Sequence, residues 1–340
     1  MNPAHYSDSP GGKPKVSVIT GYYNRSDAVE ATIRSILDQT FRDLELIAFD
    51  DCSNDGTGEC LLRLQAELGD SRFRVIIHET NRGFTQGMID AIAASQADYI
   101  CIQGSGDVSL PERIARQVQL LDSRPEVGAV GCWYTNIVST TGARRERRPN
   151  ADDVALEDLL EENVFSHGEV MMRRETYLRA GGYRVAFKYS QDIDLWLRIV
   201  RLARLATVPE FLYERYVRFD GVSYEPRKFS LQARYSILAR RFAVMPPADA
   251  QDALQRLAAH GPSTMIPDND PDLQKRYIKG ALRSAIFDAS TNAEEVVRSN
   301  VTGAALRFGL VAFIRLLRSP LMSPARTLTA RMLGIKARGA

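Results

Sequence analysis

A group of carboxylates directly follows an apolar segment of the chain. Residues 44–49 read Leu-Glu-Leu-Ile-Ala-Phe, and residues 50–57 then read Asp-Asp-Cys-Ser-Asn-Asp-Gly-Thr. In open α/β sheets, ligands bind outside the carboxyl ends of the strands, so Asp50 and Asp51 would offer hydrogen-bond acceptors there. Carboxylates accept hydrogen bonds from nucleobases or sugar hydroxyls and, less often, hold a metal ion. The alternative is a solvated turn that supplies the N-cap of a following helix.

The elements that would position this turn can be read from hydrophobic periodicity. Short apolar segments predict strands, and segments with apolar residues three or four apart predict helices. Strands are expected at 16–20, 44–49, 73–77, 99–102 and 127–133, and helices at 26–37, 57–68, 81–94 and 111–121. Strands that alternate with helices predict an α/β fold with a parallel sheet covered by helices.

The pattern changes after residue 134. We expect an exposed loop or hairpin at 142–150, a helix at 155–162, a strand at 167–173, a helix at 191–203 and a strand at 212–218. From about Pro226 onward only helices are expected.

Composition is that of an ordinary globular protein, with 44% hydrophobic and 25% charged residues over 340 residues. The net charge of +2 gives no reason to expect a nucleic-acid partner. The four cysteines form no CxxC pair, which favours a reducing compartment and therefore a cytoplasmic protein. We expect no signal peptide and no transmembrane helix, because no apolar segment is long enough.

Several short motifs occur in order along the chain. They are Val16-Ser17-Val18-Ile19 with Tyr23-Asn24, Gln39-Thr40-Phe41, Asp50-Asp51-x-Ser53-x-Asp55-Gly56-Thr57, Asn81-x-Gly83, Leu110-Pro111-Glu112-Arg113-Ile114, and Gly181-Gly182-Tyr183-Arg184 followed by Gln191-Asp192-Ile193-Asp194-Leu195-Trp196. In this order they resemble the family 2 glycosyltransferases, which have the GT-A fold, over about residues 14–218. The resemblance implies an enzyme that moves one sugar from a nucleotide-diphosphate sugar to an acceptor hydroxyl, with inversion at the anomeric carbon.

By this resemblance, Asp192 is the general base that takes the proton of the acceptor hydroxyl. Its place at the start of a predicted helix fits that role, since N-terminal amides and the helix dipole keep a carboxylate charged. The alternative is that Asp192 only caps the helix.

The resemblance also implies a nucleotide pocket. Asp50 or Asp51 would accept a hydrogen bond from the nucleobase, and the backbone between Thr20 and Asn24, including Tyr22, would line the pocket. Arg82 would balance the charge of the diphosphate, or else is a solvated loop arginine.

The chain departs from the family where the fourth strand ends. An Asp-x-Asp motif is expected there to carry Mg²⁺ or Mn²⁺, yet residues 103–107 read Gln-Gly-Ser-Gly-Asp. Asp107 is the one carboxylate in this segment. Three outcomes stay open: Asp107 is the sole metal or diphosphate-sugar contact, the enzyme works without metal, or the protein has lost activity.

Three further residues are assigned to the acceptor and phosphate side by the resemblance. His167 is a metal ligand or a hydrogen-bond donor to phosphate, or else structural. Gln191 precedes the proposed base. Trp196 stacks on a sugar ring or, given its helical spacing with Ile193 and Val200, packs in the core.

The last part of the chain, residues 303–340, contains seven basic residues and no acidic residue. An apolar segment at 304–317 is interrupted by arginines and is too short to span a bilayer. The pattern predicts a basic amphipathic helix on an anionic membrane surface. The alternative is a helix that packs on the catalytic domain.

Together these observations predict a flexible N-terminus at 1–13, a GT-A domain at 14–225 and a helical C-terminal region at 226–340. The expected function is an inverting glycosyltransferase of hexosyltransferase type that extends a glycan acceptor, lipid-linked, in bacterial surface polysaccharide synthesis, on the inner face of the plasma membrane. The alternatives are a non-catalytic nucleotide-sugar-binding module and a nucleotidyltransferase.

Overall fold

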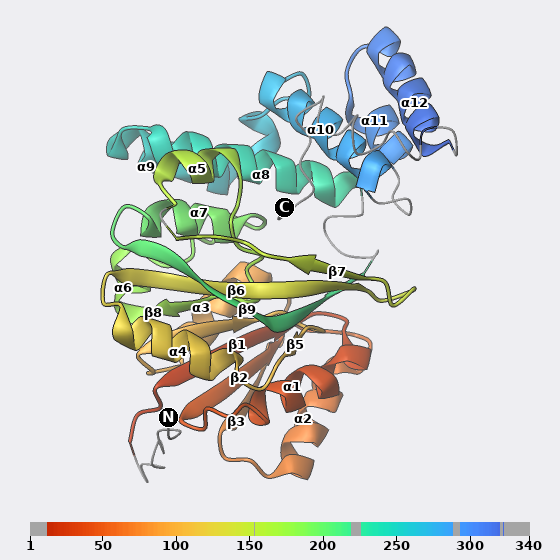
Figure 1. Cartoon of the computed structure of the whole chain (residues 1–340). Coiled ribbons are helices and arrows are strands. Elements are labelled where there is room, and N and C mark those ends of the chain that lie inside the picture. The colour runs from red at the N-terminus through yellow and green to blue at the C-terminus, as the bar shows by residue number, and fades with distance from the viewer. Residues whose placement is uncertain (1–11, 153, 219–225, 288–292, 320–321, 323–340) are drawn as a thin grey trace. The chain divides into compact units, whose positions relative to one another are not determined.

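The computed structural model describes residues 12–152, 154–218, 226–287, 293–319 and 322. The chain divides into two compact units, Met1–Val217 and Arg218–Ala340. Figure 1 shows a sheet with its helices in the first unit and helices in the second. The division falls between the last strand and the first of the C-terminal helices.

The first unit contains one mixed nine-stranded sheet. Its strands are β1 (Val16–Tyr22), β2 (Leu44–Asp50), β3 (Phe73–Ile77), β4 (Tyr99–Gln103), β5 (Val108–Ser109), β6 (Val127–Val138), β7 (Arg144–Arg147), β8 (Met171–Arg173) and β9 (Arg204–Val217). The order is β3-β2-β1-β4-β8-β6-β9-β5, and β7 pairs with β6. The first four strands run parallel, whereas β8 runs antiparallel to both β4 and β6.

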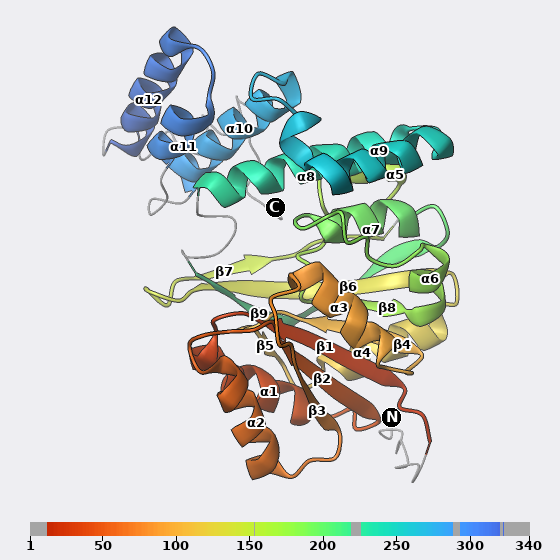
Figure 2. The same ribbon diagram turned by 180° about the vertical axis from the view of Figure 1, so that it is seen from behind.

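Helices cover both faces of this sheet. They are α1 (Val29–Leu37) after the short η1 (Ser26–Ala28), α2 (Thr57–Leu68), α3 (Phe84–Ala93), α4 (Arg113–Ser123), α5 (Leu156–Glu161), α6 (Arg174–Arg179) and α7 (Gln191–Ile199). Apolar side chains of α1, α2 and α4 share one core with β1, β2, β4 and β6. The helix α4 lies in front of the sheet in Figure 1, and α3 lies in front of it in Figure 2.

The strand register places the polar residues that end β1, β2 and β4 at the same edge of the sheet. Tyr22 pairs with Asp50 across β1 and β2, and Thr20 pairs with Gln103 across β1 and β4. The strands β1, β2 and β4 are buried along almost their whole length, as parallel strands covered on both faces are. The aspartate turn and the loop after β4 therefore leave the sheet side by side at its carboxyl edge.

The expected strands and helices up to residue 134 are found, with small shifts at their ends. The predicted strand at 167–173 was too long, because only Met171–Arg173 pair in the sheet and the next residues form α6. The last strand begins at Arg204, earlier than expected, and pairs with β6 along most of its length. The sheet is mixed and not wholly parallel, because β5, β7 and β8 pair with their neighbours antiparallel.

The second unit contains only helices among its described residues: α8 (Pro226–Val244), α9 (Pro247–His260), the short η2 (Pro262–Thr264), α10 (Pro271–Phe287), α11 (Ala293–Asn300) and α12 (Ala304–Arg318). The helices α10, α11 and α12 contact one another. Within the described ranges, none of the helices combines the length and the apolar character that a membrane crossing needs. The basic residues Arg326, Arg331, Lys336 and Arg338 and the N-terminal residues 1–11 lie outside the described residues.

Candidate active site

The aspartate turn after β2 is held by its own side chains and by the end of β1. Asp50 accepts hydrogen bonds from the backbone amide (3.1 Å) and the hydroxyl (2.5 Å) of Ser53. The Ser53 hydroxyl in turn accepts the backbone amide of Asn24 at 2.8 Å, and the Asn24 side-chain oxygen accepts the amide of Asn54 at 3.0 Å. Asn24 has a left-handed backbone, φ +52°. The two loops thus form one hydrogen-bonded rim at the carboxyl edge of the sheet.

Asp51 connects this rim to the start of α3. Its carboxylate accepts the backbone amides of Arg82 and Gly83, each at 2.8 Å, and Oδ1 lies 3.0 Å from Nδ1 of His78. Its carbonyl accepts the side-chain amide of Asn81 at 3.0 Å. Asp51 is buried, so its charge is stabilised by amides at a helix start.

The loop after β4 is connected to β9 through Asp107. The Tyr213 hydroxyl donates to Oδ2 of Asp107 at 2.6 Å, and the Tyr216 amide donates to Oδ1 at 2.9 Å. The amide of Gly104 donates to the Tyr213 oxygen at 3.0 Å. Burial raises the pKa of Asp107, and the hydrogen bond from Tyr213 opposes that rise.

A buried arginine joins this loop to the segment before β8. The guanidinium of Arg113 donates to the side chain of Gln103 at 2.9 Å, to the hydroxyl of Ser109 at 2.7 Å and to the carbonyl of Gly168 at 2.9 Å. It also lies over the ring of Tyr213, 4.7 Å from its centroid. Gly168 packs so closely that a Cβ there would meet the Tyr213 oxygen at 2.4 Å.

His167 lies among aromatic side chains from three segments. Its ring centroid is 6.0 Å from that of Phe84, 5.8 Å from that of Tyr183 and 6.4 Å from that of Trp196. Nε2 lies 2.7 Å from the Tyr183 hydroxyl. Burial lowers the pKa of His167, and the negative charge of Asp192 opposes this. With φ +75°, His167 occupies the left-handed region that β-branched and bulky residues avoid.

Two carboxylates in the first turn of α7 have different surroundings. Asp194 is buried and forms ion pairs with Arg198 at 2.6 Å and Arg184 at 3.4 Å. Asp192 is partly exposed, and the amide of Asn163, at 2.8 Å, is its one hydrogen-bond donor among the described residues. Only Asp192 therefore keeps most of its acceptor capacity for another molecule.

The residues predicted from sequence are joined by a series of contacts. Asp51 binds the amide of Gly83, and the next residue, Phe84, contacts His167. Asp192 acts electrostatically on His167, and Gly168 lies against the Tyr213 hydroxyl that binds Asp107. This series brings the carboxyl edge of β2, the loop after β4 and the start of α7 into one site.

The other residues predicted from sequence are at least partly buried or contact a neighbouring helix. The side chains of Thr20, Tyr22 and Trp196 are buried. Neither the Thr20 hydroxyl nor the Trp196 indole N–H has a hydrogen-bond partner within the described part of the chain. The Arg82 guanidinium donates to Asp90 of α3 at 2.6 Å, and Gln191 is half-buried at the first position of α7.

The residues available for a divalent cation are few. No group of three or more His, Cys, Asp or Glu side chains is placed to hold a metal ion in the described ranges. Asp107 accepts two hydrogen bonds, and a carboxylate offers about four lone-pair positions, so it retains room for one cation contact. Mg²⁺ at phosphate sites is held by one or two carboxylates, with phosphates and waters as its other ligands.

Sequence reasoning missed several residues of this site. Tyr213, Tyr216, Asn163 and His78 belong to no motif, and Arg113 appears only within the motif that runs into the start of α4. They reach the site through pairings distant in the chain, such as the Tyr213 hydroxyl and the Tyr216 backbone amide with Asp107. No local pattern could have identified them.

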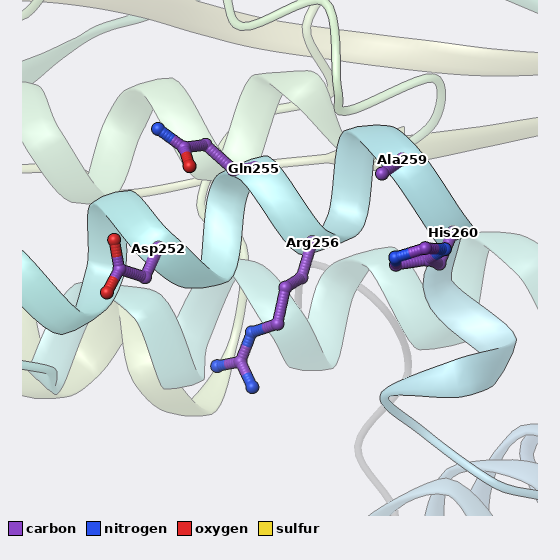
Figure 3. A pocket seen from close by; sticks show the side chains of 5 residues that line it. All are labelled: Asp252, Gln255, Arg256, Ala259 and His260. Atoms are coloured by element: carbon purple, nitrogen blue, oxygen red, sulfur yellow. The ribbon is translucent and has the colours of Figure 1, made fainter.

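An open pocket also occurs on α9, in the second unit. Figure 3 shows its lining side chains, Asp252, Gln255, Arg256, Ala259 and His260. All five come from one exposed stretch of a single helix, and none is a residue that the sequence predicted as functional. We assign it no role.

Comparison with known proteins gives consistent results. The model of the family described as Glycosyl transferase family 2 matches residues 17–181. The protein named "Putative glycosyltransferase EpsE" of Bacillus subtilis (strain 168) is 32% identical over 229 residues, which cover 66% of this chain and 80% of that protein. "Putative teichuronic acid biosynthesis glycosyltransferase TuaG" of the same organism is 28% identical over 195 residues, which cover 56% of this chain and 73% of TuaG.

Among solved structures, the fold resembles that of the mannosyltransferase PcManGT from Pyrobaculum calidifontis, in complex with GDP-Man and Mn²⁺. The TM-score is 0.53 at 18% identity, covering 95% of this chain and 90% of that one. The likeness extends the agreement from sequence to the arrangement of the strands and helices.

Proposed function

This chain belongs to glycosyl transferase family 2, and on that premise we propose that it transfers one sugar from a nucleotide-diphosphate sugar to a glycan hydroxyl, with inversion. We place this reaction in bacterial surface polysaccharide synthesis. The teichuronic acid biosynthesis named for TuaG supports that setting.

The observation that carries the proposal is the contrast between Asp192 and Asp194. Asp194 is neutralised by two arginines, whereas Asp192 is partly exposed and accepts one amide hydrogen bond from Asn163. A general base needs an unneutralised carboxylate that can reach a substrate proton. We therefore assign the base role to Asp192.

The proposed step is a direct displacement. As Asp192 takes the proton from the acceptor hydroxyl, the hydroxyl oxygen forms a bond to the anomeric carbon of the donor sugar. The bond from that carbon to the diphosphate oxygen breaks, and its electron pair leaves with the nucleoside diphosphate. Attack from the face opposite the leaving group inverts the anomeric configuration.

The donor nucleotide is assigned to the rim formed by the first two loops. Asp50 or Asp51 would accept a hydrogen bond from the nucleobase, and the backbone from Thr20 to Asn24 would line the pocket. The hydrogen bonds that fix Asn24, Ser53 and Asp50 support this assignment, because they hold the rim in one conformation. Arg82 would reach the diphosphate only by exchanging its contact with Asp90.

The diphosphate and the donor sugar are assigned to the loop of Asp107. We propose that the Asp107 carboxylate would supply one contact to a bound Mg²⁺ or Mn²⁺, which would neutralise charge on the departing diphosphate. The Mn²⁺ in the complex of PcManGT supports a divalent cation. Asp107 also holds the loop against β9 through its hydrogen bonds with Tyr213 and Tyr216.

The acceptor side comprises His167, Gln191 and Trp196. The His167 ring would donate a hydrogen bond to substrate, since its Nε2 contact with Tyr183 fixes its orientation. Trp196 would support the wall of the site from behind His167, because its own ring is buried. A lipid-linked glycan acceptor would place the enzyme on the inner face of the plasma membrane.

Two experiments test this function. A thermal-shift screen of nucleoside diphosphates and nucleotide sugars, with and without Mn²⁺, would report base, sugar and metal preference, because a ligand that binds only the native state raises the melting temperature. Transfer or hydrolysis of the best donor should then be lost in Asp192→Asn with donor binding intact. Donor binding without any turnover in the wild type would instead indicate a non-catalytic binding module.

A further inference from the structure

The last described helix, α12, has two apolar sides. Val311, Ile314 and Leu317 are buried, and α12 contacts α10 and α11. At 100° per residue, Phe308, Ala312 and Leu316 form a strip on the opposite side of the helix. A helix that only completed a bundle would normally be polar there.

This second side is exposed to an unusual degree for apolar residues. Phe308 is 80% exposed, Leu316 is 50% exposed, and Leu306 nearby is 49% exposed. Ala305, Gly309 and Ala312, which lie among them, are exposed as well. Contiguous exposed apolar surface on a soluble domain marks a site of contact with another molecule or with a membrane.

The charge of α12 indicates whether the exposed strip meets another molecule or a membrane. By the same helical geometry Arg315 borders the strip next to Phe308, whereas Arg307 and Arg318 fall on the side of the buried Val311 and Ile314. The helix α12 contains no acidic residue. Arg315 also pairs with Glu294 of α11 at 3.0 Å, which fixes this border of the strip to the bundle. The whole segment 303–340 has seven basic residues and no acidic one. An exposed apolar strip on a segment whose charged residues are all basic matches the headgroup and acyl boundary of an anionic bilayer.

Length restricts the mode of contact. The helix spans Ala304–Arg318, 15 residues, or about 22 Å at 1.5 Å per residue. The hydrocarbon core of a bilayer is about 30 Å thick. A membrane-bound α12 is therefore too short to span the bilayer and would lie in the interface with its axis parallel to the membrane plane.

We propose that the exposed strip of α12, centred on Phe308 and Leu316, docks the protein on membranes rich in anionic phospholipid. The inference goes beyond the transfer reaction, because membrane binding requires neither donor nor acceptor.

The test is co-sedimentation of the full-length protein with vesicles of phosphatidylcholine alone or mixed equally with phosphatidylglycerol. Wild type should bind the anionic vesicles, and binding should weaken as salt is raised. The double variant Phe308→Ser/Leu316→Ser should bind at least tenfold more weakly. Arg307→Glu should weaken binding to anionic vesicles alone. Leu178→Ser, at an equally exposed leucine of α6 (61%), is the matched control and should bind as the wild type does.

Melting temperatures and solution mass identify the other outcomes. The substituted side chains are exposed, so the variants should keep the wild-type melting temperature. Equal vesicle binding by wild type and the double variant would overturn the proposal. A wild-type dimer that ignores vesicles and becomes monomeric in the double variant would also overturn it and would identify the strip as a self-association surface.

Discussion

The hydroxyl of Tyr213 donates a 2.6 Å hydrogen bond to the carboxylate of Asp107, although 106 residues separate them in the chain. The same oxygen accepts the amide of Gly104. Strand β9 thus supports the loop in which the usual Asp-x-Asp pattern is incomplete. Asp107 has a position that is fixed before any donor arrives.

Removing that hydroxyl should loosen the loop. Tyr213→Phe leaves one oxygen of a largely buried carboxylate without its donor, which we expect to lower stability by about 1.5–3 kcal/mol. Catalytic efficiency should fall about tenfold or more if the loop positions the diphosphate. Urea unfolding and donor titration measure the two effects. Tyr134→Phe, at a partly buried tyrosine of β6, is the comparison. Unchanged donor affinity would remove the loop from the donor site.

The two acids at the start of α7 should separate catalysis from stability. Asp192→Asn should reduce kcat by about 10²–10⁴, the range for a lost general base, with little change in melting temperature. Asp194→Asn should instead lower the melting temperature, because it leaves Arg184 and Arg198 without their shared partner. Steady-state kinetics and thermal unfolding of both variants decide the assignment. Activity in Asp192→Asn would exclude it as the base.

Close packing makes Gly104 intolerant of a side chain. A Cβ at this position would lie 2.2 Å from Oδ2 of Asp107 and 3.0 Å from the Tyr213 hydroxyl. Gly104→Ala should therefore displace Asp107 and reduce donor binding at least as much as Tyr213→Phe does. Gly309→Ala is the control, since a Cβ there meets no atom within 4 Å and removing a helix glycine is stabilising by up to about 1 kcal/mol. Normal donor binding by Gly104→Ala would show that the loop adapts.

Asp51 should contribute to folding whether or not it also meets the nucleobase. Asp51→Asn leaves only one acceptor oxygen at this position, so one of the amides of Arg82 and Gly83 loses its acceptor and the other loses a charged one. We expect a loss of about 1.5–3 kcal/mol in unfolding free energy. Chemical denaturation measures it, and hydrogen exchange at the start of α3 should rise locally. An unchanged amide exchange rate at residues 82 and 83 would contradict a stabilising role for these two hydrogen bonds.

The stability of the protein should depend on pH through His167. Its pKa lies below the ordinary value of 6.5 in the folded state because of burial. As pH falls from 6.5 toward the folded pKa, the unfolded chain binds a proton there before the folded protein does. Stability is therefore fully present above 6.5 and is lost as pH falls through this window.

His167→Gln should remove this component from the pH dependence of the melting temperature. His260→Gln, on the exposed surface of α9, should leave it in place. Asp192→Asn should enlarge the loss of stability and extend it to lower pH, since the folded pKa of His167 falls further without the charge of Asp192. Superimposable pH profiles for wild type and His167→Gln would refute the linkage.

Much of the first unit could be predicted because its signals are local. The apolar segments of β1, β2 and β4 and the spacing of Val29, Ile33 and Ile36 in α1 follow from burial on one or both faces. The short strand β5 was not predicted, since two residues carry no periodicity, and β8 was predicted four residues too long. The segment before β8 was read as strand, yet His167 is left-handed and the Gly168 carbonyl binds Arg113.

For the candidate site, the motifs predict residues but not their contacts. Asp50, Asp51, Asp107 and Asp192 were identified from motifs, but which amide or hydroxyl each one meets depends on distant segments. The ion pairs that neutralise Asp194 and leave Asp192 accessible are one example. Sequence spacing alone cannot distinguish the accessible Asp192 from the neutralised Asp194, because both lie in the first turn of α7.

A buried hydrogen bond links α3 to the segment before α7. The hydroxyl of Thr85, near the start of α3, donates at 2.8 Å to the carbonyl of Phe187, which precedes α7 by a few residues, and both groups are buried. A chimaera that grafts the acceptor segment of a relative onto this sheet must therefore preserve this contact as well as the grafted residues. Engineering a new product linkage would therefore need α3 and the stretch before α7 to be exchanged together. Either segment alone would lack the hydrogen-bond partner that the other supplies.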